Sequence, residues 1–195
     1  MPAAPRLILA STSVYRRQLL ERLKVPFEVA NPGVAEPHHP GESPPARSAR
    51  LAAEKARAVA ASHPQAVVIG SDQVAVCRGQ VLDKPGSEAG CWEHLRRLSG
   101  AVAEFHTAVA LLGPDPAALI TFSDLTRVHF RTLSEAEIRR YVSLDKPYDC
   151  AGAFRAESLG ISLFERIESE DPTGLVGLPL IALSTALRRA GFELP

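Results

Sequence analysis

The sequence lacks net charge, paired cysteines and long apolar runs. Its 195 residues carry 22 basic and 22 acidic side chains, without the basic excess that nucleic-acid surfaces usually show. The three cysteines, Cys77, Cys91 and Cys150, are scattered, which argues against a disulfide framework or zinc site and is typical of a reducing compartment. No apolar run approaches the ~18 residues that a membrane span needs. We expect a cytoplasmic protein with no stable nucleic-acid complex and no membrane anchor.

Lysine is also scarce, since the chain has 4 lysines against 18 arginines. Where arginine is the usual cation, each lysine merits attention, and two of them, Lys55 and Lys84, lie in segments singled out below. Apolar residues make up 46% of the chain and charged residues 23%, as in ordinary folded proteins. The length suits one sizeable core, so we expect a single domain over residues 1–195.

Short apolar strands alternate with amphipathic helices along the chain. We expect strands at 7–10, 25–30, 66–70, 102–112, 118–131 and 161–167, and helices at 14–23, 46–62, 88–98, 134–144 and 178–190. Residues 73–77 should continue the third strand or pair with it, and a turn at 113–116 should join the two long strands as a hairpin. This pattern predicts an α/β domain with a mixed sheet and flanking helices.

The end of the first strand is a candidate phosphate site. Ser11, Thr12 and Ser13 follow the strand, and the next helix carries Arg16 and Arg17 in its first turn. Cations are disfavoured there because the helix macrodipole is positive at that end, so a bound anion would offset them. Hydroxyl groups, backbone N–H groups and guanidinium groups together suit a phosphate. The alternative is an ordinary Ser13 N-cap with solvated arginines.

Asp72 is the strongest candidate for a catalytic or metal-binding residue. It follows the buried strand 66–70, in the triplet Ser71-Asp72-Gln73. Ligands of α/β sheets bind at the carboxyl ends of strands, where a carboxylate can bind a metal or activate water. An aspartate that only caps the strand end is the alternative. The apolar residues 74–76 favour a side chain aimed into a pocket.

Three other charged residues are weaker candidates. Glu36 is the only carboxylate between Asn31 and Pro40, in a proline-rich loop, and could join Asp72 in holding a hard divalent cation. Lys84 precedes a proline that makes its turn rigid, which suits an ammonium contacting a phosphate. Lys55 lies in the middle of a helix, next to Glu54. A solvated side chain is the common alternative for all three.

Several segments, in order and spacing, match one family pattern: residues 9–13 with Arg16 and Arg17, Glu36, residues 53–56, 70–73, 84–85, 151–152 and 176–180. Together they resemble the Maf family of nucleotide pyrophosphatases, from Leu7 to about Arg189. The resemblance implies a long mixed sheet with a central cleft, related to inosine-triphosphate pyrophosphatases, and a homodimer. It also implies divalent-metal-dependent hydrolysis of a nucleoside triphosphate to the monophosphate and pyrophosphate.

The resemblance assigns a role to each candidate residue. The implied catalytic residues are Asp72, Glu36 and Lys84. The implied phosphate-binding residues are Ser11, Arg16, Arg17, Lys55 and Lys84. Asp72 and Glu36 would hold Mg²⁺ or Mn²⁺, and Asp72 would be either the base for the attacking water or a metal ligand.

Residues 71–73, 154–157 and 163–168 further resemble the family branch that acts on 7-methylguanosine triphosphate. The branch acting on dTTP and UTP tends to carry Thr where Gln73 stands and Gln where Glu157 stands. Methylation at N7 makes guanine cationic, so the ring of Tyr15 and the carboxylate of Glu157 are suitable partners, while Gln73 can adapt to donor or acceptor edges. We expect these three residues to select the base.

Two alternatives to 7-methylguanosine triphosphate remain at this point. The nearer is the same hydrolysis on dTTP, UTP or other modified nucleotides. The more distant is a non-enzymatic regulatory role in septum formation, which the family's association with cell division suggests.

Overall fold

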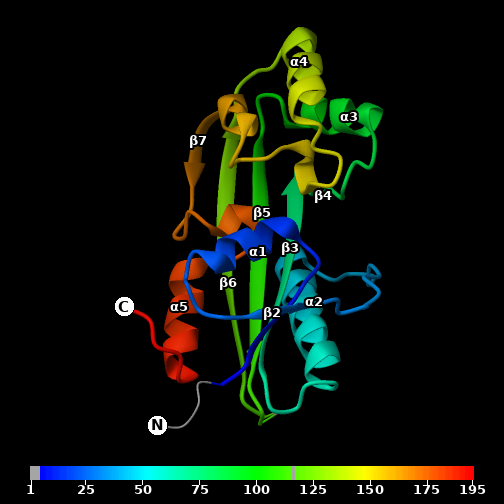
Figure 1. Ribbon diagram of the computed structural model, residues 1–195. Helices are drawn as coiled ribbons and strands as arrows, with labels where there is room; N and C mark the ends of the chain where they lie inside the picture. The colour runs from blue at the N-terminus through cyan, green and yellow to red at the C-terminus, as the bar shows by residue number, and fades with distance from the viewer. Residues whose placement is uncertain (1–4, 116) are drawn as a thin grey trace. The chain divides into compact units, whose positions relative to one another are not determined.

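The computed structural model describes residues 5–115 and 117–195, and its strands form a mixed sheet (Figure 1). The strands are β1 (Leu7–Ala10), β2 (Glu28–Ala30), β3 (Val67–Cys77), β4 (Gln80–Val81), β5 (Val102–Leu112), β6 (Leu119–Phe130) and β7 (Phe164–Glu168). Their order is β2-β1-β3-β5-β6-β7, with β4 paired to β3. β1 is parallel to β2 and β3, whereas the β3–β4 and β6–β7 pairs are antiparallel. The predicted α/β fold with a mixed sheet is confirmed.

Five α-helices and three short 3₁₀ segments accompany the sheet in the described residues. The helices are α1 (Val14–Glu21), α2 (Pro44–Ala60), α3 (Glu88–Leu98), α4 (Glu135–Asp145) and α5 (Leu180–Arg189). The 3₁₀ segments are η1 (Ala151–Ala153), η2 (Leu159–Leu163) and η3 (Gly174–Val176). None of the helices in the described part of the chain is both long and apolar enough to cross a membrane.

Two predicted strands begin three residues later in the structure. The predicted strand 25–30 is reduced to Glu28–Ala30, the three residues that pair with Ile8–Ala10 of β1. Residues 161–163 of the predicted strand 161–167 belong to η2, and β7 begins at Phe164. The strand that starts at Val67 continues to Cys77, which confirms the predicted continuation over residues 73–77. The predicted turn at 113–116 includes residue 116, which lies outside the described residues.

The chain divides into two compact units. The first comprises the residues up to Gln73, Thr107–Asp124 and Asp171–Pro195, and the second comprises Val74–His106 and Leu125–Glu170. β3, β5 and β6 therefore contribute residues to both units.

In the first unit, helices cover both faces of the parallel strands. Successive side chains of a strand point to opposite faces, so β1 supplies two separate clusters. Its odd-numbered residues join a leucine-rich cluster with α1 and α5: Leu7, Leu9, Leu19, Leu20, Ile69, Leu183 and Leu187. Its even-numbered residues join an alanine-rich cluster with α2: Ile8, Ala10, Ala52, Ala53, Ala56, Val59 and Val68. The small side chains of the second cluster allow α2 to lie close to the sheet.

Gly70 is the point of closest approach between α2 and β3. A Cβ atom at this position would overlap the carbonyl oxygen of Ala52 and come within 2.7 Å of the backbone nitrogen of Ala56. Both obstacles are backbone atoms of α2, so no rotation of a side chain could relieve the overlap. Glycine is thus required here by the space between helix and strand.

The second unit is held by an aromatic cluster. Phe105, Phe130, Phe154 and Phe164 pack edge-to-face, with ring centroids 5.0–5.4 Å apart. Helix α4 begins with the predicted capping box, in which Ser134 and Glu137 bond reciprocally. The aromatic contacts connect β5, β6, β7 and the residue that follows η1 within this unit.

We expect Gly70→Ala to lower the free energy of unfolding by about 3 kcal/mol, because the added methyl group forces α2 away from β3. Urea denaturation followed by circular dichroism measures the change. Gly113→Ala is the matched control, since an added Cβ there meets nothing within 4 Å and the backbone needs no positive φ. Equal stability of the two variants would mean that the α2–β3 approach tolerates a methyl group.

Candidate active site

A buried lysine in the first unit joins two carboxylates. The Nζ atom of Lys55 lies 2.6 Å from Oδ1 of Asp72 and 2.6 Å from Oε1 of Glu36. The side chains of Lys55 and Asp72 are each 8% exposed, whereas that of Glu36 is 49% exposed. The three come from α2, β3 and the segment between β2 and α2. Asp72 and Glu36, which the sequence predicts to lie together, therefore form one cluster with Lys55.

The position of Asp72 follows from the strand. Gly70 faces α2, and Asp72 lies two residues further along β3, so its side chain points to the same face. On the helix, Lys55 directly precedes Ala56, which contacts Gly70. The neighbouring strand β1 ends at Ala10, opposite Gly70. Asp72 thus lies inside a continuous strand, next to the place where its parallel neighbour has stopped.

The cluster is electrostatically coupled to Arg16. Burial raises the pKa of Asp72 above its usual range, while Lys55 and Arg16 oppose this rise and Glu36 adds to it. Burial also lowers the pKa of Arg16, against the opposing effect of the Asp72 and Glu36 carboxylates. Arginine stays protonated, so the four groups comprise two cations and two carboxyl groups.

The backbone carbonyl of Gly177 orients Arg16. It accepts a hydrogen bond from Nε of Arg16 at 3.2 Å and another from Oγ of Ser71 at 2.8 Å. Gly177 has φ +120°, and a Cβ there would lie 3.1 Å from Nε of Arg16. The close approach of Arg16 and the positive φ both require glycine at this position.

Gln73 supports the same segment. Its amide nitrogen donates to Oγ1 of Thr107 at 2.8 Å and to the carbonyl oxygens of Gly174 at 3.2 Å and Leu175 at 3.0 Å. Because carbonyl oxygens only accept, these contacts identify the nitrogen of the side-chain amide. The family resemblance predicts that Gln73 selects the base, and in the structure its NH₂ group binds the protein's own η3 backbone.

The start of α1 contains both buried and exposed groups. Ser11 is buried, and its Oγ accepts from the backbone nitrogen of Ser13 at 3.1 Å. Ser13 is the N-cap of α1, as the alternative reading of this segment expected. Tyr15 is half-buried, and Arg17 pairs with Glu21 at 3.0 Å with a side chain that is 61% exposed. The structure therefore brings Arg16 to the cluster and leaves Arg17 on the outer side of the helix.

Residues 6–190 match the family described as Maf-like protein. The chain belongs to this family. The resemblance predicted from the sequence is thereby confirmed.

Relatives of this Maf-like chain match it over almost their full length. A protein of Xanthomonas oryzae pv. oryzae named "7-methyl-GTP pyrophosphatase" is 56% identical over 191 residues, which are 98% of this chain and 100% of the relative. A protein of the same name from Aromatoleum aromaticum is 53% identical, over 97% of this chain and 98% of the relative. The solved Ham1 protein of Staphylococcus aureus shares the fold, with a TM-score of 0.55 and 15% identity over 95% of this chain and 99% of that one.

Two predicted site residues lie in the second unit. Lys84 follows β4, and Glu157 lies between η1 and η2. Both are exposed within that unit. Their roles as phosphate-binding and base-selecting residues stay predictions from the family resemblance.

The Maf resemblance implies a divalent cation, and the carboxylates of Asp72 and Glu36 fit one. Each places an oxygen 2.6 Å from the same cationic atom, Nζ of Lys55, so their charges already converge on one cation. The described residues contain no group of three or more His, Cys, Asp or Glu side chains that could hold a metal ion. A hard cation held by two carboxylates commonly completes its coordination with waters and substrate phosphates.

Sequence reasoning missed the supporting residues Ser71, Thr107 and Gly177. The family resemblance includes residues 176–180 but gives no role to Gly177. Glycine directly before a Leu-Pro pair was the available signal, because it departs from the Ser, Thr, Asp or Asn that usually begin a helix. Thr107 lies in a strand with no sequence signal of its own.

We expect Lys55→Met to lower the free energy of unfolding by about 3 kcal/mol at pH 7.5, because it leaves buried Asp72 without its nearest cation. The pKa of Asp72, already raised by burial, would rise further above its unfolded value. The folded state would then bind more protons than the unfolded state, so stability falls as pH rises through this interval.

The deficit should therefore be smaller at pH 5 than at pH 7.5 in urea denaturation. Lys84→Met removes an exposed lysine and serves as the control, with little loss at either pH. An equal deficit of Lys55→Met at both pH values would contradict the uncompensated carboxylate as its cause.

Proposed function

We propose that this protein hydrolyses 7-methyl-GTP to the nucleoside monophosphate and pyrophosphate. The relatives named 7-methyl-GTP pyrophosphatase support the reaction and the substrate, at 56% and 53% identity over nearly the whole chain. The observation that carries the proposal is the cluster of Lys55 with Asp72 and Glu36, because it combines a phosphate-binding cation with two carboxylates suited to metal binding and proton transfer.

Arg16 and Lys55 are the cations of the first unit that would hold the phosphates. Arg16 keeps one edge of its guanidinium on the Gly177 carbonyl, which orients the remaining N–H donors. Lys55 would exchange part of its contact with the carboxylates for a phosphate oxygen. The hydroxyl of buried Ser11 is a further donor at the end of β1.

Asp72 is the candidate base. Water attacks the α-phosphorus, the bond from that phosphorus to the bridging oxygen of the β-phosphate breaks, and Asp72 accepts the proton from the water. Burial raises the pKa of Asp72, which brings this carboxylate closer to the pH range in which a general base works best. Lys55, 2.6 Å away, keeps the carboxylate ionised and oriented before the proton arrives.

We propose that Asp72 and Glu36 hold Mg²⁺ or Mn²⁺. Two cations and two carboxylates already balance in the cluster, while a triphosphate adds several negative charges. A bound divalent cation would supply positive charge to the pyrophosphate leaving group.

A cytoplasmic location and a homodimer complete the proposal. Both follow from the sequence analysis, and both concern the whole protein rather than the site. Light scattering of the purified protein tests the assembly, with a mass near twice that of one chain expected and a single-chain mass contradicting it.

Release of pyrophosphate from 7-methyl-GTP, GTP, dTTP, UTP and CTP, with Mg²⁺ and then Mn²⁺, tests the reaction and the base together. We expect the highest kcat/KM for 7-methyl-GTP, and a smaller preference over dTTP and UTP in Glu157→Gln. If the unmodified protein preferred pyrimidine nucleotides, the proposed reaction would stand and the proposed substrate would be wrong. No release from any nucleotide would overturn the proposed function.

Asp72→Asn should lower kcat by 10²- to 10⁴-fold, because an amide cannot accept the proton of the attacking water. Calorimetric titration with Mn²⁺ separates the two roles of this residue. If the variant still binds Mn²⁺ but has lost turnover, Asp72 acts as the base. If it has lost both Mn²⁺ binding and turnover, Asp72 is a metal ligand. A folded Asp72→Asn protein with near-normal turnover would exclude both roles.

A further inference from the structure

We infer that Arg50 is a positioning residue, which fastens the segment carrying Glu36 to helix α2 and so sets the Glu36 carboxylate beside Lys55 and Asp72. For its effect on catalysis the inference rests on the proposed function. For its effect on the segment it rests on geometry alone. Every residue concerned lies in the first unit.

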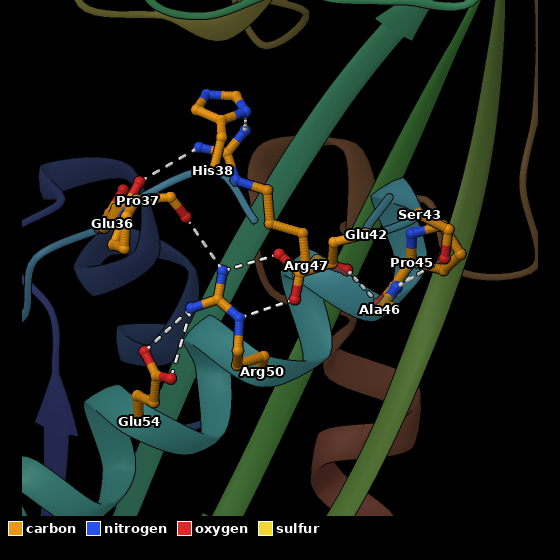
Figure 2. Close-up of polar contacts among 11 residues, drawn as sticks. Glu36, Pro37, His38, Glu42, Ser43, Pro45, Ala46, Arg47, Arg50 and Glu54 are labelled. Carbon is orange, nitrogen blue, oxygen red and sulfur yellow. Dashed lines mark hydrogen bonds and ion pairs between the residues drawn. The ribbon is translucent and has the colours of Figure 1, made fainter. Parts of the chain in front are cut away.

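Arg50 links the segment to the helix through all three guanidinium nitrogens (Figure 2). Nε and Nη2 form a bidentate pair with the carboxylate of Glu42, at 2.7 and 2.8 Å. Nη2 also donates to the carbonyl oxygen of Pro37 at 3.1 Å, next to Glu36 in the chain. Nη1 binds the carboxylate of Glu54, one turn along α2, at 3.2 and 3.3 Å. One side chain therefore ties two points of the segment to the helix.

Arg47 adds a second connection from the same helix. Its Nη2 lies 3.5 Å from the carbonyl oxygen of Glu36, and its Nη1 lies 3.0 Å from Nδ1 of His38 (Figure 2). Arg47 and Arg50 are three residues apart on α2, so they face the segment from one side of the helix. Together the two arginines contact two successive backbone carbonyls, those of Glu36 and Pro37.

The segment needs such fastening because it has no regular structure of its own. β2 ends at Ala30 and α2 begins at Pro44, with neither helix nor strand between them. The side chain of Glu36 is 49% exposed, so packing does not confine it as it confines Lys55 and Asp72. The position of its carboxylate therefore depends on the backbone that carries it.

Charge assigns Arg50 to positioning rather than to phosphate binding. Glu42 and Glu54 both raise the pKa of Arg50, and Arg50 in turn lowers the pKa of Glu42. The side chains of Arg50 and Glu42 are only 19% and 14% exposed, so little of this pair faces solvent. Two carboxylates contact the guanidinium of Arg50 and neutralise its positive charge, so Arg50 is unsuited to binding a triphosphate.

Arg50→Gln tests the inference, with Arg57→Gln as the matched control. Arg57 lies on the same helix, is exposed and enters no contact with the segment among the described residues. Hydrogen exchange of the metal-free protein should become faster across residues 31–43 in Arg50→Gln alone. Unchanged exchange in that segment would overturn the inference, whatever nucleotide the protein cleaves.

Two further readouts separate positioning from a general loss of stability. Mn²⁺ affinity measured calorimetrically without nucleotide should fall about tenfold in Arg50→Gln, as is usual when a residue orienting a metal ligand is lost. Glu42→Gln should reproduce the direction of the change, since it removes the charge of the bidentate partner. The melting temperature of each variant is compared with that of Arg57→Gln.

A double-mutant cycle with Glu36→Gln decides whether Arg50 acts through Glu36. In the Glu36→Gln background, Arg50→Gln should lower kcat/KM by less than twofold, whereas in the unmodified protein the loss should be about tenfold. Equal losses in both backgrounds would overturn positioning through Glu36. If the unmodified protein cleaved no nucleotide, the proposed function would fail, while hydrogen exchange and Mn²⁺ binding would still decide the role of Arg50.

Discussion

The contact between the backbone of α2 and Gly70 of β3 is the constraint on which the rest of the first unit depends. A helix can lie this close to a strand only where both present small residues, and here the helix presents Ala52 and Ala56 to a glycine. The short separation lets Lys55 reach Asp72 with a 2.6 Å contact inside the protein. A larger residue at position 70 would displace the helix and separate the charges.

Burial and ion pairing have opposite effects on the pKa of Asp72 at this cluster. Removing a carboxylate from water is costly, and the raised pKa of Asp72 reflects that cost. Lys55 and Arg16 offset it, so the carboxylate is retained where little solvent competes for it. A ligand that drew Lys55 away would raise the pKa of Asp72 further, because it would remove a cation that opposes the effect of burial. Stability and proton transfer are thus linked through one lysine.

Hydrogen bonds from arginine side chains to backbone carbonyls position several of the groups around this cluster. The Gly177 carbonyl orients Arg16, and the Pro37 carbonyl is one of the points by which Arg50 fastens the Glu36 segment. In both places a guanidinium binds the main chain on one edge while other donors bind elsewhere, which a lysine could not reproduce. The preference for arginine over lysine in this chain, 18 to 4, is consistent with such use.

Local patterns in the sequence determined most of the fold and named Asp72, Lys55 and Glu36 as candidates. The helix Glu88–Leu98 and the strand Val102–Leu112 lie as predicted, because periodicity, capping residues and turn glycines act within a few residues. Tertiary structure alone decided that Lys55 contacts both Asp72 and Glu36, that Arg16 rather than Arg17 joins them, and that Gln73 binds η3. Those outcomes depend on contacts such as that of Arg16 with Gly177, 161 residues away, which no local pattern encodes. The extent of β2 was decided in the same way, since only Glu28–Ala30 pair with β1.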